Sequence, residues 1–211
     1  QLPPAAFAVG PDLPPPGTVT MRYIRMGNTG VQGDSSQALY VGPDGNPWIG
    51  GYDPNFEEGG MAKYVVGQDR FVNISNVDLP ILGSPDITGS AQFRDITGDR
   101  TGRLWFANAA KVFSMDPAAG ARSITDVDLD GAAGPSGGAT DLDTSPDGRV
   151  WAADPEAGLV ARIGPNARIT TWAIQATNVA AQPRPGGAYY VWVSTPAGFS
   201  SAPATRRFDS V

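Results

Sequence analysis

The sequence predicts an all-β repeat protein, because one short unit recurs four times and strand-like runs flank each copy. The unit is a tight polar turn that leads directly into a Trp. It reads GPDGNPW at 42–48, DRTGRLW at 99–105, SPDGRVW at 145–151 and, less regularly, RPGGAYYVW at 184–192. Successive Trp residues of these units are 57, 46 and 41 positions apart. Recurrence at this interval indicates a chain built from small, similar sheets.

Each unit contains four expected strands. In the third unit a short run precedes the turn, Trp151 begins the next strand, and two further runs follow at 158–163 and 167–172. These runs are rich in β-branched and aromatic residues and are bounded by Gly, Pro, Asn and Asp, which is typical of strands and hairpins. Four short strands joined by tight turns make one propeller blade. One indole at the same place in each blade would fill the space between neighbouring sheets. We therefore expect a β-propeller of four-stranded blades.

We expect about four blades in this chain, at about 35–77, 91–127, 138–174 and 178–211, within a propeller domain of residues 18–211. Residues 1–17 hold six of the 20 prolines and are expected to form a Pro-rich N-terminal arm. Residues 7–24 also match the third and fourth strands of a blade and would complete the last one. That pairing would close a small ring without open edges, whereas the alternative is part of a larger propeller of six or seven blades.

Charge and composition exclude several classes of function. The net charge is −6 and no basic run exceeds two residues, so we expect no nucleic-acid partner. No run of 18 apolar residues occurs, so we expect no membrane span. The chain has neither His nor Cys, which removes Ser-His and Cys-His nucleophile pairs and the commonest zinc and copper ligands.

The third unit, residues 137–174, resembles the repeats of the virginiamycin B lyase-like propellers and of the related NHL and two-component-regulator propellers. The shared pattern is P-D-G-x-x-W, a loop, an I-x-R-I-like strand and a turn before the last strand. The resemblance implies the propeller fold, which hosts enzymes and scaffolds alike. The lyases of this family use a His with a Glu and magnesium, and this chain has no His to take that role.

Calcium-dependent lactonases of similar fold use carboxylate and Asn ligands in the central channel. In this chain the first strands of the expected blades would line that channel. Their polar side chains are of mixed type and do not form a ring of acids: Gln37, Gln92, Arg94, Asp141 and Asn178.

Two groups of residues are candidate sites. Asp126, Asp128 and Asp130, followed by Gly131, match the opening half of a calcium loop, although Gly137 stands where the loop requires a Glu. Calcium is therefore the one cofactor that we consider, and the alternative is a polar turn after a strand. The second group lies in loops after the Trp strand and could bind a ligand or simply be solvated: Tyr52, Asp53, Phe56, Glu57, Asn108, Asp154 and Glu156.

We expect a non-catalytic propeller that acts as a binding or scaffold module, for example as a subunit of an extracellular or virion assembly. The absence of His and Cys, the acidic charge and the Pro-rich arm favour an extracellular, periplasmic or surface location, with a protein partner or self-assembly through the arm. The alternative is a metal-dependent lyase or lactonase-like enzyme that uses the central channel. No catalytic residue is assigned.

Overall fold

The computed structural model describes residues 35–53, 58–75, 93–108, 111–129, 138–164, 167–195 and 204–209. The expected N-terminal arm and the segment 7–24 lie outside the described residues. Within the described part, no helix is long and apolar enough to cross a membrane.

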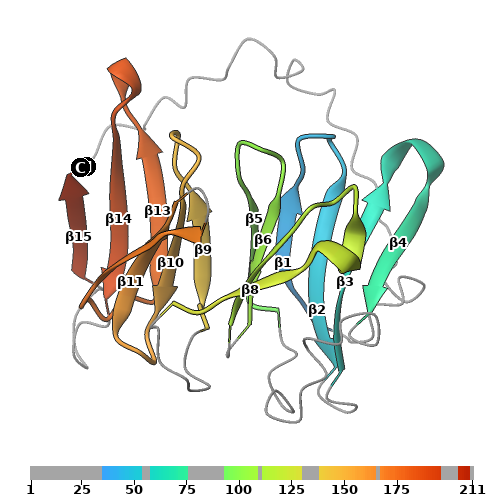
Figure 1. Cartoon of the computed structure of the whole chain (residues 1–211), viewed down its shortest axis with the longest axis horizontal. Coiled ribbons are helices and arrows are strands. Elements are labelled where there is room, and N and C mark those ends of the chain that lie inside the picture. The colour runs from blue at the N-terminus through green and yellow to red at the C-terminus, as the bar shows by residue number, and fades with distance from the viewer. Residues whose placement is uncertain are drawn as a thin grey trace, which may run out of the picture.

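The chain is an all-β propeller with four blades, each an antiparallel sheet whose strands follow chain order (Figure 1). Blade 1 contains β1 (Ser35–Val41), β2 (Pro47–Asp53), β3 (Glu58–Val65) and β4 (Arg70–Ser75). Blade 2 contains β5 (Asp95–Gly98), β6 (Leu104–Ala107), β7 (Val112–Met115) and β8 (Thr125–Val127). Blade 3 contains β9 (Asp141–Thr144), β10 (Val150–Asp154), β11 (Leu159–Ile163) and β12 (Ile169–Trp172). Blade 4 shows three described strands: β13 (Asn178–Pro183), β14 (Tyr189–Thr195) and β15 (Ala204–Asp209).

Short 3-10 turns are the only helical elements of the described chain. They are η2 (Val66–Gln68) between β3 and β4, η5 (Gly120–Ser123) before β8, and η7 (Pro185–Gly187) between β13 and β14. Among the described residues no helix lies between the sheets, as a radial stack of blades requires.

The turn before each Trp strand explains why the repeat carries a glycine there. Gly45, Gly102 and Gly148 have φ between 73° and 85°, a left-handed conformation that residues with a Cβ rarely adopt. Each glycine N–H donates to the carbonyl three residues earlier, at 2.8 to 3.0 Å, and so closes the turn. The strands on either side are thereby held in register for the Trp that follows.

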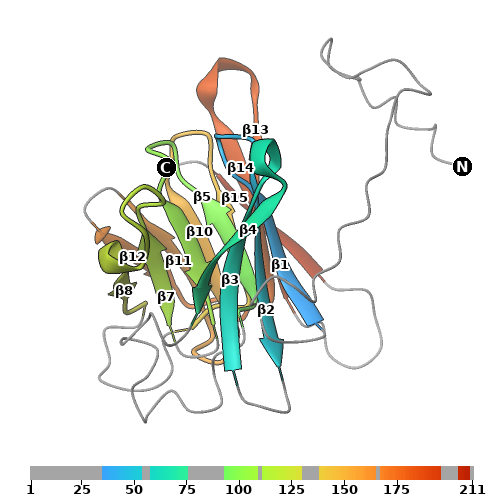
Figure 2. The same cartoon turned by 90° about the vertical axis from the view of Figure 1, so that its right-hand side faces the viewer.

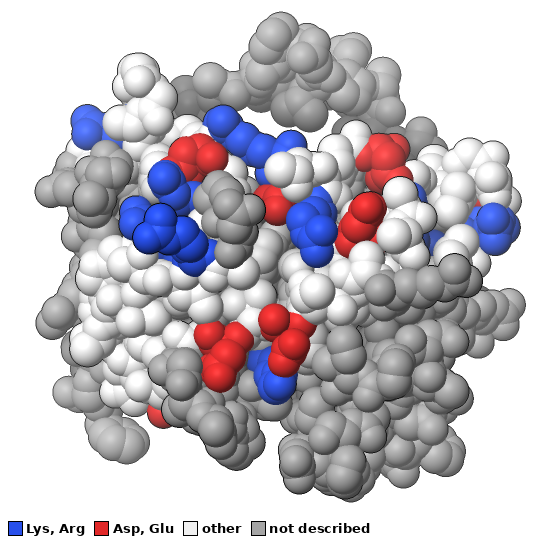
Figure 3. Space-filling view, viewed as in Figure 1, with Lys and Arg blue, Asp and Glu red and all other residues white. Residues whose placement is uncertain are grey.

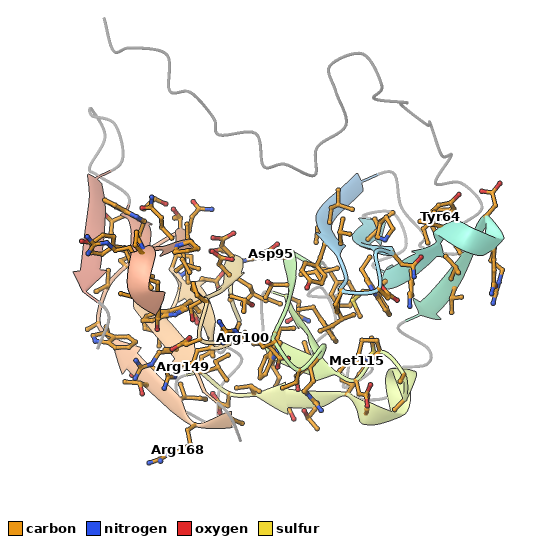
Figure 4. The ribbon with its side chains drawn as sticks, turned by 90° about the horizontal axis from the view of Figure 1, so that it is seen from above. Tyr64, Asp95, Arg100, Met115, Arg149 and Arg168 are labelled. Carbon is orange, nitrogen blue, oxygen red and sulfur yellow. The ribbon has the colours of Figure 1, made fainter. Side chains whose placement is uncertain are left out.

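The four blades form an open arc around a common axis. The first strand of each blade is the innermost one, and β5 contacts both β1 and β9, while β9 also contacts β13. Seen from above, blades 1 and 4 extend in opposite directions from the axis (Figure 4). Figure 2 views the molecule from the side of blade 1, which is the described blade nearest the viewer. The described strands therefore do not close a four-bladed ring by themselves.

The described residues form three apolar core layers, one between each pair of neighbouring blades. We call the face of a blade that looks toward the preceding blade its leading face, and the opposite one its trailing face. Trp48 lies in the layer between blades 1 and 2, Trp105 in the next and Trp151 in the third. All three indoles are at least nine-tenths buried, with exposures of 3%, 7% and 3%. The expectation that one Trp per blade fills the space between sheets is confirmed for these three.

Aromatic rings reinforce two of these layers. Between blades 1 and 2, Phe106 stacks on Phe113 at 5.3 Å and meets the edge of Phe93 at 5.5 Å, measured between ring centroids. Between blades 3 and 4, Trp151 stacks on Trp172 at 5.2 Å. Such pairs add about 0.5–1.5 kcal/mol each to the free energy gained by burial.

Candidate functional site

The loop residues expected to bind a ligand are only partly described. Tyr52 and Asp53 form the end of β2, where the structure describes the backbone but not the side chains. Phe56 and Glu57 lie outside the described residues. The ligand-binding role of this part of the group therefore stays a prediction.

Asn108 and Asp154, the corresponding residues of blades 2 and 3, are buried at the ends of β6 and β10. The Lys111 N–H donates to Asn108 Oδ1 at 2.8 Å, and the N–H groups of Glu156 and Ala157 donate to Asp154 Oδ1 at 3.0 and 2.9 Å. Both side chains thus cap the hairpin turn that follows their strand, which is a common use of Asn and Asp. This turn chemistry explains why the two residues stand at equivalent places.

Glu156 has an exposed side chain whose carboxylate lies 3.7 Å from the Arg94 guanidinium. The pair joins the β10–β11 turn of blade 3 to the residue before β5 of blade 2. An exposed ion pair of this kind contributes little to stability, about 0–1 kcal/mol. Its position shows that the predicted ligand residues of blade 3 lie close to the start of the innermost strand of blade 2.

The predicted calcium ligands lie at and after β8. Asp126 accepts a hydrogen bond from Lys111 Nζ at 2.6 Å, and this ion pair lowers the pKa of the Asp126 carboxyl. A cation at Asp126 would therefore have to compete with the Lys111 ammonium group. Asp128 is exposed, and Asp130 lies outside the described residues. In the described ranges no three acidic side chains are grouped so as to hold a metal, and calcium binding here stays a prediction.

A cluster of carboxyl groups that the sequence analysis did not assemble lies on the innermost strands. Its members are Asp95 on β5 and Asp141 and Asp143 on β9. Figure 4 shows Asp95 at the inner edge of the arc, between blades 2 and 3. Asp95 and Asp141 occupy the same repeat position, since each lies two residues before the cross-strand partner of the blade's Trp. In the sequence this appears as an Asp ten residues before Trp105 and before Trp151.

Each carboxyl of this inner cluster reaches across to the next innermost strand. Asp95 Oδ2 accepts the Leu142 N–H at 2.7 Å, and Asp141 Oδ2 accepts the Val179 N–H at 2.6 Å. Asp143 Oδ2 accepts the N–H of Ala181, also at 2.6 Å. An innermost strand has no further strand to pair with, so these side chains satisfy its outward backbone donors. The cluster therefore ties blade 2 to blade 3 and blade 3 to blade 4.

Burial and mutual repulsion raise the pKa of two of these carboxyls. The pKa of Asp141 is raised to about 7, first by burial and then by the charges of Asp95 and Asp143, while the Val179 N–H opposes the rise. Burial also raises the pKa of Asp95. The two carboxyls lie close enough to interact, and the pair as a whole therefore holds a proton more readily than either carboxyl would alone in water. A carboxyl that titrates near neutral pH can exchange a proton, although Oδ2 of Asp141 already accepts the Val179 N–H.

At the blade 1 end of the arc, one repeat position that is buried in the other three blades is exposed. The residue just before the Trp's cross-strand partner is Leu39, Ile96, Leu142 and Val179 in blades 1 to 4. In blades 2, 3 and 4 it is 3%, 5% and 5% exposed, because the preceding blade covers the leading face. In blade 1 the same position, Leu39, is 66% exposed, and Val41 beside it is 58% exposed. The exposure is confined to β1, because Ala62 and Tyr64 on β3, which lie on the same face, are only 0% and 4% exposed.

Charge does not mark a site on the face shown in Figure 3. Acidic and basic side chains are interspersed over the described part of that face, without a broad patch of one sign. The net charge of −6 is therefore not concentrated there.

Comparisons with known proteins agree with the fold. No protein-family model matches the sequence. No curated protein matches it either. The chain is similar in structure to virginiamycin B lyase from Staphylococcus aureus, with a TM-score of 0.55 and 14% identity over 83% of this chain and 55% of the lyase.

Two further structures resemble the chain at similar strength. The extracellular domain of a one-component system from B. thetaiotaomicron gives a TM-score of 0.58 and 13% identity over 82% of this chain and 22% of that one. Hydrazine synthase from Kuenenia stuttgartiensis gives a TM-score of 0.55 and 14% identity over 89% of this chain and 49% of the synthase chain. The fold thus defines the chain as a β-propeller. The chain spans little more than half the length of the lyase.

Proposed function

We propose that this chain is a protein-binding propeller module that acts at the cell surface or outside the cell. The observation that carries the proposal is the exposure of two apolar side chains on β1: Leu39 is 66% and Val41 58% exposed, while the three counterparts of Leu39 in the other blades are nearly buried. Contiguous exposed apolar surface on a folded domain is typical of a contact site for another protein. The similarity to the extracellular domain of a sensor protein supports the location.

The inner carboxyl cluster supports a binding role rather than catalysis. Its three carboxyls accept backbone N–H groups of the neighbouring blade, so they act as ties between blades. The sequence has no His or Cys to serve as base or nucleophile beside them. The second candidate is an acid–base enzyme that uses the proton held by Asp95 and Asp141 as a pair, which the raised pKa of Asp141 favours.

Site-specific photo-crosslinking tests the binding role. We would place p-benzoyl-phenylalanine at position 39 and, as a control, at position 66, where Val66 is 53% exposed in the η2 turn. Irradiation of cells that make the full chain should join a protein to position 39 and not to position 66. Equal or absent products at the two positions would contradict a contact site on this face.

The enzyme alternative has its own readout. Asp141→Asn keeps an oxygen for the Val179 N–H but holds no exchangeable carboxyl proton. A propeller enzyme of this kind would lose turnover in this variant, whereas the crosslink at position 39 would persist. Loss of the crosslink together with normal folding would count against the binding module.

A further inference from the structure

We propose that the partner binds β1 through an extended acidic segment, which carries two carboxylates on alternate residues beside apolar surface. This inference rests on the proposed binding function and names the chemistry of its partner. Two observations on the same stretch of β1 carry it. Leu39 and Val41 expose their side chains there, and blade 1 has no carboxylate at the places from which the other blades serve the corresponding backbone N–H groups.

In each of the other three blades, a carboxylate accepts the backbone N–H that corresponds to that of Leu39. The pairs are Ile96 N with Asp95 Oδ1, Leu142 N with Asp95 Oδ2, and Val179 N with Asp141 Oδ2, at 2.8, 2.7 and 2.6 Å. These donors lie on the free edge of the innermost strand, where the blade has no further strand to accept them. The carboxylate therefore takes the place of a missing strand partner.

The N–H that corresponds to that of Val41 is served in the same way in blades 3 and 4. Asp143 Oδ1 accepts the Thr144 N–H at 2.7 Å, and Asp143 Oδ2 accepts the Ala181 N–H at 2.6 Å. Asp95 likewise serves one donor on its own strand and one on the next. A bridging carboxylate is thus the repeated link between neighbouring innermost strands of blades 2 to 4.

Blade 1 lacks this link on its own innermost strand. Ala38 and Tyr40 stand at the repeat positions that Asp141 and Asp143 hold in blade 3. Among the described residues, no carboxylate accepts either of the two outward N–H groups of β1. Water can hydrate these donors while β1 is exposed, but a partner that covers β1 must bring acceptors of its own, since a buried N–H without an acceptor is costly.

The spacing of the two donors sets the spacing of the partner's acceptors. Leu39 and Val41 are alternate residues of one strand, so their N–H groups lie roughly 7 Å apart on the same edge. Asp141 and Asp143 show that two carboxylates on alternate residues of an extended strand reach two such donors, here on β13. Apolar side chains stand beside these carboxylates in the layer between blades 3 and 4. The partner segment should combine both features.

The photo-crosslink at position 39 tests this chemistry on the full chain. Mass spectrometry of the product identifies the partner's peptide, which should carry Asp or Glu on alternate residues. Changing both acids to Asn or Gln in the partner should lower the crosslink yield about tenfold or more, because a charge-assisted hydrogen bond is about twice as strong as a neutral one. The same change at two acids outside that peptide should leave the yield unchanged.

The donor side is tested by Val41→Pro, which removes one backbone N–H of this chain and keeps an apolar side chain. Val41 pairs with Pro47, which has no N–H, and it lies on an edge strand, where Pro is tolerated. The control Val41→Ala keeps the N–H and trims the side chain. In isothermal titration the purified partner should bind Val41→Pro about tenfold more weakly than Val41→Ala. Both variants should unfold at the urea midpoint of the wild type.

The outcomes separate failure of the acidic segment from failure of the binding role. A crosslinked peptide without acids on alternate residues would overturn the acidic segment and leave the binding module standing. An unchanged yield after the acids are replaced, or equal affinities of Val41→Pro and Val41→Ala, would do the same. Absence of any product at position 39, or a product formed only within the same polypeptide, would overturn both proposals.

Discussion

Replacing Leu142 and Leu39 by Ala, one at a time, compares two leucines that hold the same repeat position and differ in burial. Leu142 is 5% exposed and lies in the layer with Trp105, whereas Leu39 is 66% exposed. Removing three carbons from a packed site leaves a cavity and costs about 2–5 kcal/mol. The same change at an exposed site shifts the free energy of unfolding by no more than about 0.5 kcal/mol.

Urea unfolding followed by far-UV circular dichroism measures both costs. It should be done on dilute purified protein, so that no second molecule covers Leu39. For a chain of this size the loss at Leu142 corresponds to a melting temperature lower by roughly 5–15 °C. Equal costs at the two positions would refute the reasoning, because Leu39 would then be covered within its own chain.

Two other predictions concern the contacts between blades. Since the folded-state pKa of Asp141 is raised to about 7 from 3.8, the folded chain holds a proton that the unfolded chain releases, and stability should fall as pH rises from about 4 to 7. The Asp141→Asn variant should show a flatter pH dependence, and at pH 8 its free energy of unfolding should exceed that of the wild type by on the order of 1 kcal/mol, after allowance for solvent screening. If the urea midpoint of the variant changes with pH as that of the wild type does, the assignment is contradicted. Gly98→Ala would place a Cβ against the Tyr40 hydroxyl and 2.6 Å from the ring carbon that bears it, and should cost about 1–3 kcal/mol in urea unfolding. Gly164→Ala is the control, because its nearest neighbour would be the Arg168 carbonyl at 3.5 Å, and equal costs for the two would show that Tyr40 simply moves aside.

The blade itself could be predicted from sequence because its signals are local. The glycine of each turn, the Trp that follows it and the alternating strands lie within one repeat. The strand expected at 158–163 is observed at Leu159–Ile163, and that expected at 167–172 is observed at Ile169–Trp172. Burial of Trp48, Trp105 and Trp151 followed from the same pattern.

The inner carboxyl cluster could not be predicted in the same way. Asp95 and Asp141 are 46 positions apart in the sequence, and their interaction depends on how far one blade is displaced and rotated from the next. The channel-facing residues expected from the first strands included Asp141 but omitted Asp95. Alignment of the two units on Trp105 and Trp151 would have found the shared Asp, though not its contact with the neighbouring strand.

The sequence by itself determined the repeat, the strands of each blade and the Trp that joins blade to blade, because period and turn chemistry act over a few residues. Only the tertiary structure decided which repeat positions are covered. Leu39 and Leu142 look alike in sequence, yet one is exposed and the other buried, since burial depends on whether another blade stands in front. The angle between blades, which no single repeat encodes, sets the open arc and leaves Leu39 exposed at one end of it.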